Sequence, residues 1–169
     1  IPRLVNRQAQ ALGMEVLAHD PFVSAEDVAD AGATKAEMDQ ILAESDFISI
    51  HCPLTPETRG MFNYEAFKAM KDSAYLINTS RGPVVNEPGL VRAFEEALIG
   101  GAGLDVLMED EGHEDHPLFA FENCIIAPHA AWYSETSILR RRTQTVDSVI
   151  EVLEGREPHS FLNKAALQN

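Results

Sequence analysis

Two residues of the chain carry side chains suited to proton transfer and anion binding. His129 follows the apolar run 125–128, and its imidazole titrates near neutrality, so it can both give and accept a proton. Arg81 follows three polar residues at 78–80, and a guanidinium can hold a carboxylate through two parallel hydrogen bonds. Each residue also has a simpler explanation. A histidine after a strand is often structural, and an exposed arginine often forms only a surface salt bridge.

Short apolar runs alternate along the chain with segments of helical periodicity. The pattern predicts strands over 14–20, 46–52, 74–80, 101–106 and 123–128. It predicts helices over 2–12, 24–31, 37–45, most of 55–71, 88–98 and 135–154. Strands that alternate with helices are typical of a parallel sheet with helices on both faces.

The predicted strands share one feature, which is that polar side chains stand where each strand ends. They are Asp20, His51 with Cys52 and Pro53, Asn78 to Arg81, Asp105 and His129. In open α/β sheets, ligands bind outside the carboxyl ends of the strands. The sequence therefore predicts a ligand site at this edge of the sheet.

Composition narrows the class of protein. The 169 residues are enough for one sizeable domain, and 45% of them are hydrophobic. The formal net charge of −14 would repel a phosphate backbone, so we expect no nucleic-acid partner. No apolar run reaches the roughly 18 residues that span a bilayer, so we expect no membrane partner. Two cysteines form no disulfide framework, which favours a cytoplasmic location.

Four segments resemble the nucleotide-binding domain of the D-isomer-specific 2-hydroxyacid dehydrogenases: 11–22, 51–63, 76–94 and 101–135. The stretch PHAAWYSE at 128–135 most resembles the C-terminal-binding-protein branch, which includes enzymes and NAD-sensing corepressors. The resemblance implies a Rossmann-type, doubly wound parallel α/β sheet, truncated at its N-terminus. Residues 1–157 would form the NAD-binding domain without its first strand and glycine loop. Residues 158–169 would be the tail that returns into a second, substrate domain.

The resemblance also implies NAD as the cofactor. A carboxylate at Asp20 would accept the ribose hydroxyls and repel a 2′-phosphate, although an Asp-Pro turn is the simpler explanation. Asp105 would contact the nicotinamide side, or else cap a neighbouring turn. Cys52 would pack against the cofactor, or act only as a small buried hydrophobe. The implied cofactor-binding residues are Ile1, Pro2, Asp20, Cys52, Pro53, Thr58, Thr79, Ser80, Arg81, Asp105, His129 and Ala131.

For the reaction, the resemblance implies that Arg81 holds the carboxylate of a small 2-oxo or 2-hydroxy acid and that His129 exchanges a proton with it. Asp110 stands where the family has a glutamate that orients the histidine, and it is one methylene shorter. Either the backbone lies closer, or Glu109 or Glu111 replaces it, or the pair is weaker. Trp132 would line the substrate pocket or pack between domains.

Two charged stretches have plain explanations. The acidic segment 109–116 has no spacing typical of a metal site, so we interpret it as a solvated loop and expect no metal. The three arginines at 140–142 are interpreted as a solvated helix face.

Taken together with the resemblance, the sequence predicts an NAD-dependent oxidoreductase of 2-hydroxy acids, expected to be a homodimer. The alternative is a non-catalytic NAD(H)-sensing dimeric module of the corepressor type.

Overall fold

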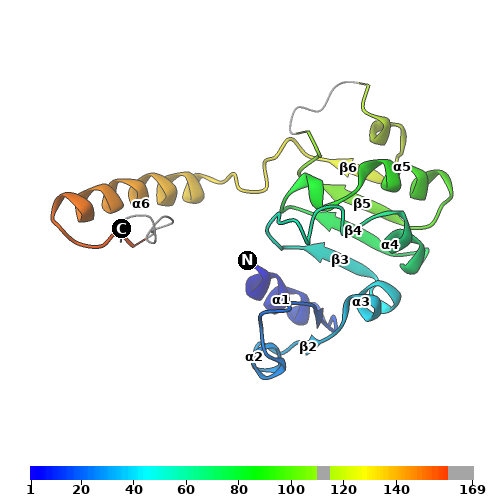
Figure 1. Cartoon of the computed structure of the whole chain (residues 1–169), viewed down its shortest axis with the longest axis horizontal. Helices are drawn as coiled ribbons and strands as arrows, with labels where there is room; N and C mark the ends of the chain where they lie inside the picture. The colour runs from blue at the N-terminus through cyan, green and yellow to red at the C-terminus, as the bar shows by residue number, and fades with distance from the viewer. Residues whose placement is uncertain (110–114, 160–169) are drawn as a thin grey trace. The chain divides into compact units, whose positions relative to one another are not determined.

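The chain forms two compact units, Ile1–His129 and Ala130–Asn169. The computed structural model describes residues 1–109 and 115–159 (Figure 1). The predicted domain boundary after residue 157 stays a prediction, since most of 158–169 lies outside the described residues. Within the described ranges, no helix is both long enough and apolar enough to cross a membrane.

The first unit is built from parallel strands and helices, as the sequence predicts. Its helices are α1 (Pro2–Ala11), α2 (Ala25–Asp30), α3 (Met38–Glu44), α4 (Tyr64–Ala69) and α5 (Glu87–Glu95), with short 3-10 turns η1 (Gly82–Val84) and η2 (Pro117–Ala120). Its strands are β1 (Leu17–Ala18), β2 (Thr34–Lys35), β3 (Phe47–Ile50), β4 (Tyr75–Asn78), β5 (Gly101–Leu104) and β6 (Cys124–Ile126).

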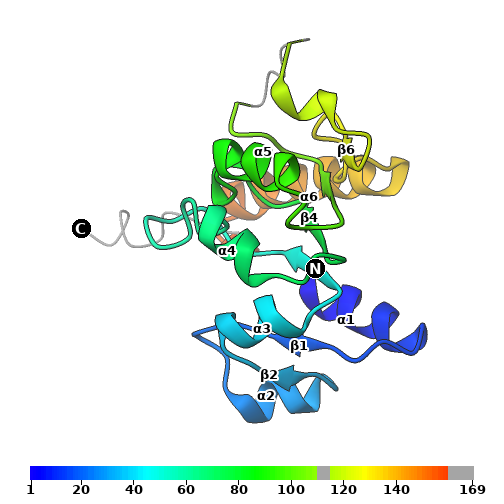
Figure 2. The same cartoon turned by 90° about the vertical axis from the view of Figure 1, so that its right-hand side faces the viewer.

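The strands form two parallel sheets rather than one. β3, β4, β5 and β6 lie side by side in chain order, whereas β1 and β2 pair separately. Figure 2 shows α2 beside the β1–β2 pair. The short strand β2 was not predicted, because only its pairing with β1 makes Thr34 and Lys35 a strand.

One face of the four-stranded sheet is the core of this unit. Side chains alternate between buried and open positions along β3 and β4, so Ile48 and Leu76 are buried while Phe47 and Tyr75 are exposed. The buried face packs in one cluster with apolar residues of α3, α4 and α5, including the fully buried Phe67 and Leu90. On the opposite face, Phe47 and Tyr75 stack at 5.7 Å between ring centroids.

The prediction of a helix over most of 55–71 is wrong in its first half, because α4 begins only at Tyr64. Gly60 has a φ of +63°, which ends any right-handed helical path there. Asn63 then caps the new helix, with its side-chain oxygen accepting from the backbone N–H of Ala66 at 3.0 Å. The loop before it is closed by the hydroxyl of Thr58, which donates to the carbonyl oxygen of Pro53 at 2.7 Å.

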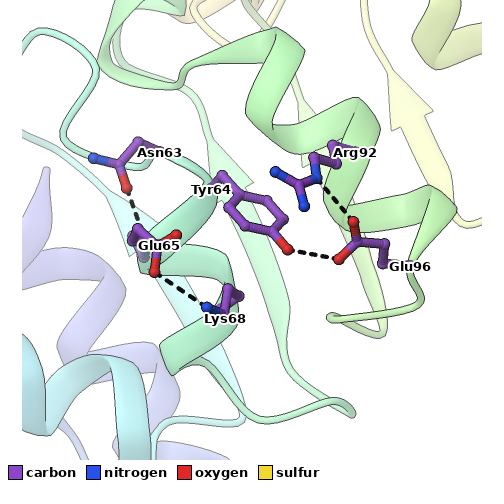
Figure 3. Close-up of polar contacts among 7 residues, drawn as sticks. Asn63, Tyr64, Glu65, Lys68, Arg92 and Glu96 are labelled. Atoms are coloured by element: carbon purple, nitrogen blue, oxygen red, sulfur yellow. Dashed lines mark hydrogen bonds and ion pairs between the residues drawn. The ribbon is translucent and has the colours of Figure 1, made fainter.

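A surface cluster joins α4 to α5 (Figure 3). The hydroxyl of Tyr64 donates to Glu96 at 2.6 Å, and Arg92 donates to the other oxygen of the same carboxylate at 2.8 Å. The guanidinium of Arg92 also lies 3.8 Å from the centroid of the Tyr64 ring. These contacts fix the two helices against each other on the outer side of the unit.

The described part of the second unit consists mainly of α6 (Glu135–Leu153). It begins with a capping box, in which Ser134 and Ser137 each accept from the other's backbone N–H. Trp132 precedes it, and the guanidinium of Arg141 lies 4.9 Å from the Trp132 ring centroid. The arginines at 140–142 are exposed, in line with a solvated face.

Candidate functional site

The register of the sheet defines a row of residues at its carboxyl edge. Ile50, Asn78, Leu104 and Ile126 are paired in turn across β3, β4, β5 and β6. Arg81 lies three residues beyond the end of β4, and His129 lies three residues beyond the end of β6. Because β5 separates those two strands, their chains leave the sheet about 10 Å apart. The end of β5 lies between them.

Asn78, the last residue of β4, builds the turn that carries Arg81. Its side chain is completely buried, and its nitrogen donates to the carbonyl oxygen of Arg81 at 3.0 Å. Its oxygen accepts from both the backbone N–H and the hydroxyl of Ser80, at 3.0 and 2.9 Å. A buried amide that uses its oxygen twice and its nitrogen once has little freedom to move, so it fixes the path of residues 79–81.

The Arg81 side chain is exposed at this edge. One of its terminal nitrogens donates to the carbonyl oxygen of Ser80 at 2.6 Å. Among the described residues, no carboxylate forms an ion pair with it. The guanidinium keeps donors available for an anionic ligand.

Asp105 directly follows β5 and lies beside the same turn. It is 6% exposed, and its backbone N–H donates to the carbonyl oxygen of Asn78 at 2.9 Å. The chain leaving β5 is thereby tied to the end of β4. Asp105 and Arg81 consequently share Asn78 as a common support.

His129 leaves the edge of β6 in an uncommon backbone conformation. Its φ is +52°, in the left-handed region that residues other than glycine seldom occupy. Its N–H donates to the carbonyl oxygen of Ala127 at 3.0 Å, and Ala127 in turn donates to Leu104 of β5 at 2.8 Å. Such conformations persist where the surroundings enforce them and are concentrated at functional sites.

The end of β3 brings a histidine and a thiol to the edge. Burial lowers the pKa of His51. The start of α1 lies on the side of the sheet to which the strand arrows point (Figure 1). Burial raises the pKa of the Cys52 thiol, in accord with a packing role.

α1 begins as a helix N-terminus suited to an anion. Ile1 and Pro2 open it, no side chain caps it, and no acidic residue stands in its first turn. Its first N–H groups and its dipole favour a phosphate there. Asp20 follows β1, and one carboxylate oxygen accepts from the N–H of Phe22 at 2.9 Å, so the predicted turn is present. The turn uses one carboxylate oxygen, and the other oxygen is an acceptor suited to a ribose hydroxyl.

Three predicted site residues lie outside the described part of the first unit. Asp110 lies outside the described residues. Ala131 and Trp132 belong to the second unit. Within the described residues, no group of three or more histidine, cysteine, aspartate or glutamate side chains is arranged to hold a metal ion.

Comparison with known proteins identifies the family of this chain. Residues 1–131 match the family described as D-isomer specific 2-hydroxyacid dehydrogenase, NAD binding domain. The chain belongs to this family. NAD is accordingly the cofactor of this dehydrogenase domain, and its fold is the Rossmann-type α/β fold that the sequence predicts. The corepressor-containing branch suggested by residues 128–135 stays a prediction.

Relatives of this dehydrogenase domain are longer proteins. A hydroxypyruvate reductase of Blautia hydrogenotrophica is 38% identical over 164 residues, which are 97% of this chain and 50% of the relative. The structure of a D-lactate dehydrogenase with NAD+ from Lactobacillus jensenii superimposes with a TM-score of 0.88 at 30% identity, over 96% of this chain and 52% of that one. A D-lactate dehydrogenase from Aquifex aeolicus complexed with NAD and lactic acid has a TM-score of 0.80 at 38% identity, over 89% and 50%. The chain thus spans about half the length of these proteins.

Sequence reasoning missed Asn78 as a residue of the candidate site. It was recognised only as a polar strand end, whereas the structure shows it supporting Arg81, Ser80 and Asp105. The signal was present, since an asparagine at the last position of a strand in a buried parallel sheet must find hydrogen-bond partners.

Proposed function

We propose that the protein containing this chain is an NAD-dependent oxidoreductase that transfers a hydride between nicotinamide and a small D-2-hydroxy acid or 2-oxo acid. The observation that carries the proposal is the register of the sheet: Arg81 and His129 leave strands on either side of β5, three residues beyond paired positions. Family membership supports it. So does the likeness to a D-lactate dehydrogenase complexed with NAD and lactic acid.

The residues at the carboxyl edge fit the cofactor. The uncapped start of α1 suits the pyrophosphate, and Asp20 suits the adenosine ribose and disfavours a 2′-phosphate. Cys52, Pro53 and the loop closed by Thr58 would form the wall on the adenine side. Thr79, Ser80 and Asp105 would face the nicotinamide side. When bound, the nicotinamide supplies or accepts the hydride at the substrate carbon.

Arg81 and His129 would handle the substrate. The guanidinium would hold the carboxylate and, through its positive charge, draw electron density from the neighbouring carbonyl as the hydride arrives. In reduction, His129 would give its proton to the carbonyl oxygen, which becomes the hydroxyl of the product. In oxidation the same ring would take that proton back.

A carboxylate partner would fix the tautomer and orientation of His129. Asp110 is our candidate, on the resemblance of the sequence, with Glu109 and Glu111 as neighbours that offer the same chemistry. On the same resemblance, Trp132 is a candidate for the substrate side and Ala131 for the cofactor side. We also infer a cytoplasmic homodimer, for which light scattering of the purified protein is the direct test.

Turnover tests the proposed function. The full-length protein is mixed with NADH and a panel of 2-oxo acids, including hydroxypyruvate, glyoxylate and pyruvate, and loss of NADH absorbance is followed. Oxidation of NADH that Arg81→Ala and His129→Ala each reduce by about 10³-fold or more is expected. Tight NADH binding without turnover on any acid would overturn the proposal and point to a nucleotide-sensing module.

A further inference from the structure

The carboxylate of Glu87 joins three segments that are distant in the sequence. Glu87 is the first residue of α5, one of its oxygens accepts from the backbone N–H of Met108, and the other contacts Nε2 of His116 at 3.1 Å. The two side chains are only 13% and 17% exposed, so the contact between them is largely shielded from water. The contact therefore holds the chain leaving β5 and the start of η2 against α5.

The hydrogen bonds of His116 define its tautomer. Nδ1 accepts from the backbone N–H of Leu118 at 3.3 Å, so the hydrogen of a neutral ring must be on Nε2, where it donates to Glu87. A ring protonated on both nitrogens would set one N–H against the N–H of Leu118. The arrangement fits one neutral tautomer, with both ring nitrogens in use.

A second contact holds the segment that leaves β5 against the turn that carries Arg81. A Cβ added to Gly82 would lie 1.7 Å from the carbonyl oxygen of Leu107, so only glycine allows this approach of the two backbones. Leu107 thus contacts the Arg81 turn, while the next residue, Met108, is held by Glu87. Residues 105–108 are therefore held against residues 81–87 at two points, Leu107 against Gly82 and Met108 against Glu87.

We propose that Glu87 is a positioning residue of the dehydrogenase: it holds the chain leaving β5, and with it Asp105, in register with the turn of Arg81. The inference rests on the proposed function, because these two residues are its candidates for the cofactor and the substrate. Glu87 acts through Met108 and His116. Small displacements of binding groups weaken ligand binding and catalysis, so the support of such groups has functional consequences.

Substitutions at both ends of the contact test the proposal in the full-length protein. Glu87→Ala removes both contacts and is expected to raise the Kd for NADH and to lower kcat, each at least tenfold. Glu87→Gln keeps an oxygen for Met108 but sets its NH2 against the ring N–H, so a change of about threefold is expected. His116→Asn keeps an acceptor for Leu118, loses the donor to Glu87, and is expected to behave like Glu87→Gln.

The control is a variant that loses stability without touching this contact. Met70→Ala opens the core before β4, at the amino end of the strands, and should keep the Kd for NADH and kcat within twofold of wild type. Equal NADH binding and kcat in Glu87→Ala and Met70→Ala would overturn the inference, as would a Glu87→Gln variant no better than Glu87→Ala.

Two readouts separate this inference from the proposed function. NADH binding, followed by fluorescence, reports on Glu87 even if the wild-type protein turns over no acid. Nitrogen-15 spectra of the His116 ring should show hydrogen on Nε2 in wild type and a mixture of tautomers in Glu87→Ala. A mixture already present in the wild-type protein would overturn the contact itself, whatever the outcome of the turnover assay.

Discussion

The side chain of Asn78 and the backbone of Arg81 form a closed turn at the end of β4, with 3.0 Å between Nδ2 and the carbonyl oxygen. The asparagine is fully buried while the guanidinium three residues later is exposed. A rigid, interior group therefore supports a cation at the edge of the sheet.

Asn78→Ala should lower the free energy of unfolding by about 1–3 kcal/mol, because the backbone groups of Ser80 and Arg81 lose buried partners. Asn123→Ala is the matched control: its exposed amide also donates to a backbone carbonyl, that of Gly100, at 3.0 Å. That loss should stay within about 0.5 kcal/mol, since water replaces the partner. Urea denaturation measures the free energy of unfolding of both variants. Equal losses would contradict a supporting role for Asn78.

Gly82→Ala should be strongly destabilising, by about 3 kcal/mol, because the added methyl meets the backbone of Leu107 and cannot be accommodated by a side-chain rotation. Gly103→Ala in β5 is its control. The nearest atom to a Cβ there is Cγ1 of Ile77 at 4.0 Å, so this variant should be neutral or slightly more stable. Thermal denaturation distinguishes the two, and similar midpoints would refute the close approach at Gly82.

The stability of the chain should depend on pH through His51. Burial lowers the pKa of this ring below its ordinary value of 6.5. Below that pH the unfolded chain binds a proton that the folded chain does not, so the free energy of unfolding falls as the pH falls. His51→Gln keeps a donor for Ser49 and removes the titration. Its urea midpoint should vary less than that of wild type between pH 7 and pH 5, and parallel curves would count against this assignment.

The thiol of Cys124 should react slowly with alkylating agents in the folded chain. Burial raises its pKa from the ordinary value of 9.0 to about 11, which lowers the thiolate fraction at neutral pH by about 100-fold. In a Cys52→Ser background, alkylation by iodoacetamide should be correspondingly slower in buffer than in urea. The same shift makes the free energy of unfolding fall as the pH rises above 9, because the unfolded thiol ionises first. Equal alkylation rates with and without urea would exclude the shift.

Local patterns in the sequence determined the class of fold and the place of the site. Alternating apolar runs and capped helical segments depend on neighbours within a few residues, so the parallel α/β sheet and the polar strand ends could be predicted. The same local view predicted one helix over most of 55–71, because it did not foresee the positive φ of Gly60 or the cap at Asn63. Sequence periodicity identifies an apolar face, but it does not fix where a helix starts when a turn competes for the same residues.

Only the tertiary structure decided how the site is supported. Glu87 meets His116 across 29 residues and Met108 across 21, and Gly82 meets Leu107 through the backbone. These contacts arise because parallel strands bring their carboxyl ends to one edge and stack the loops that follow them. No short stretch of residues contains that information, since it depends on which strand lies beside which. The sequence thus named the chemical groups at the edge, and packing determined which groups hold them in place.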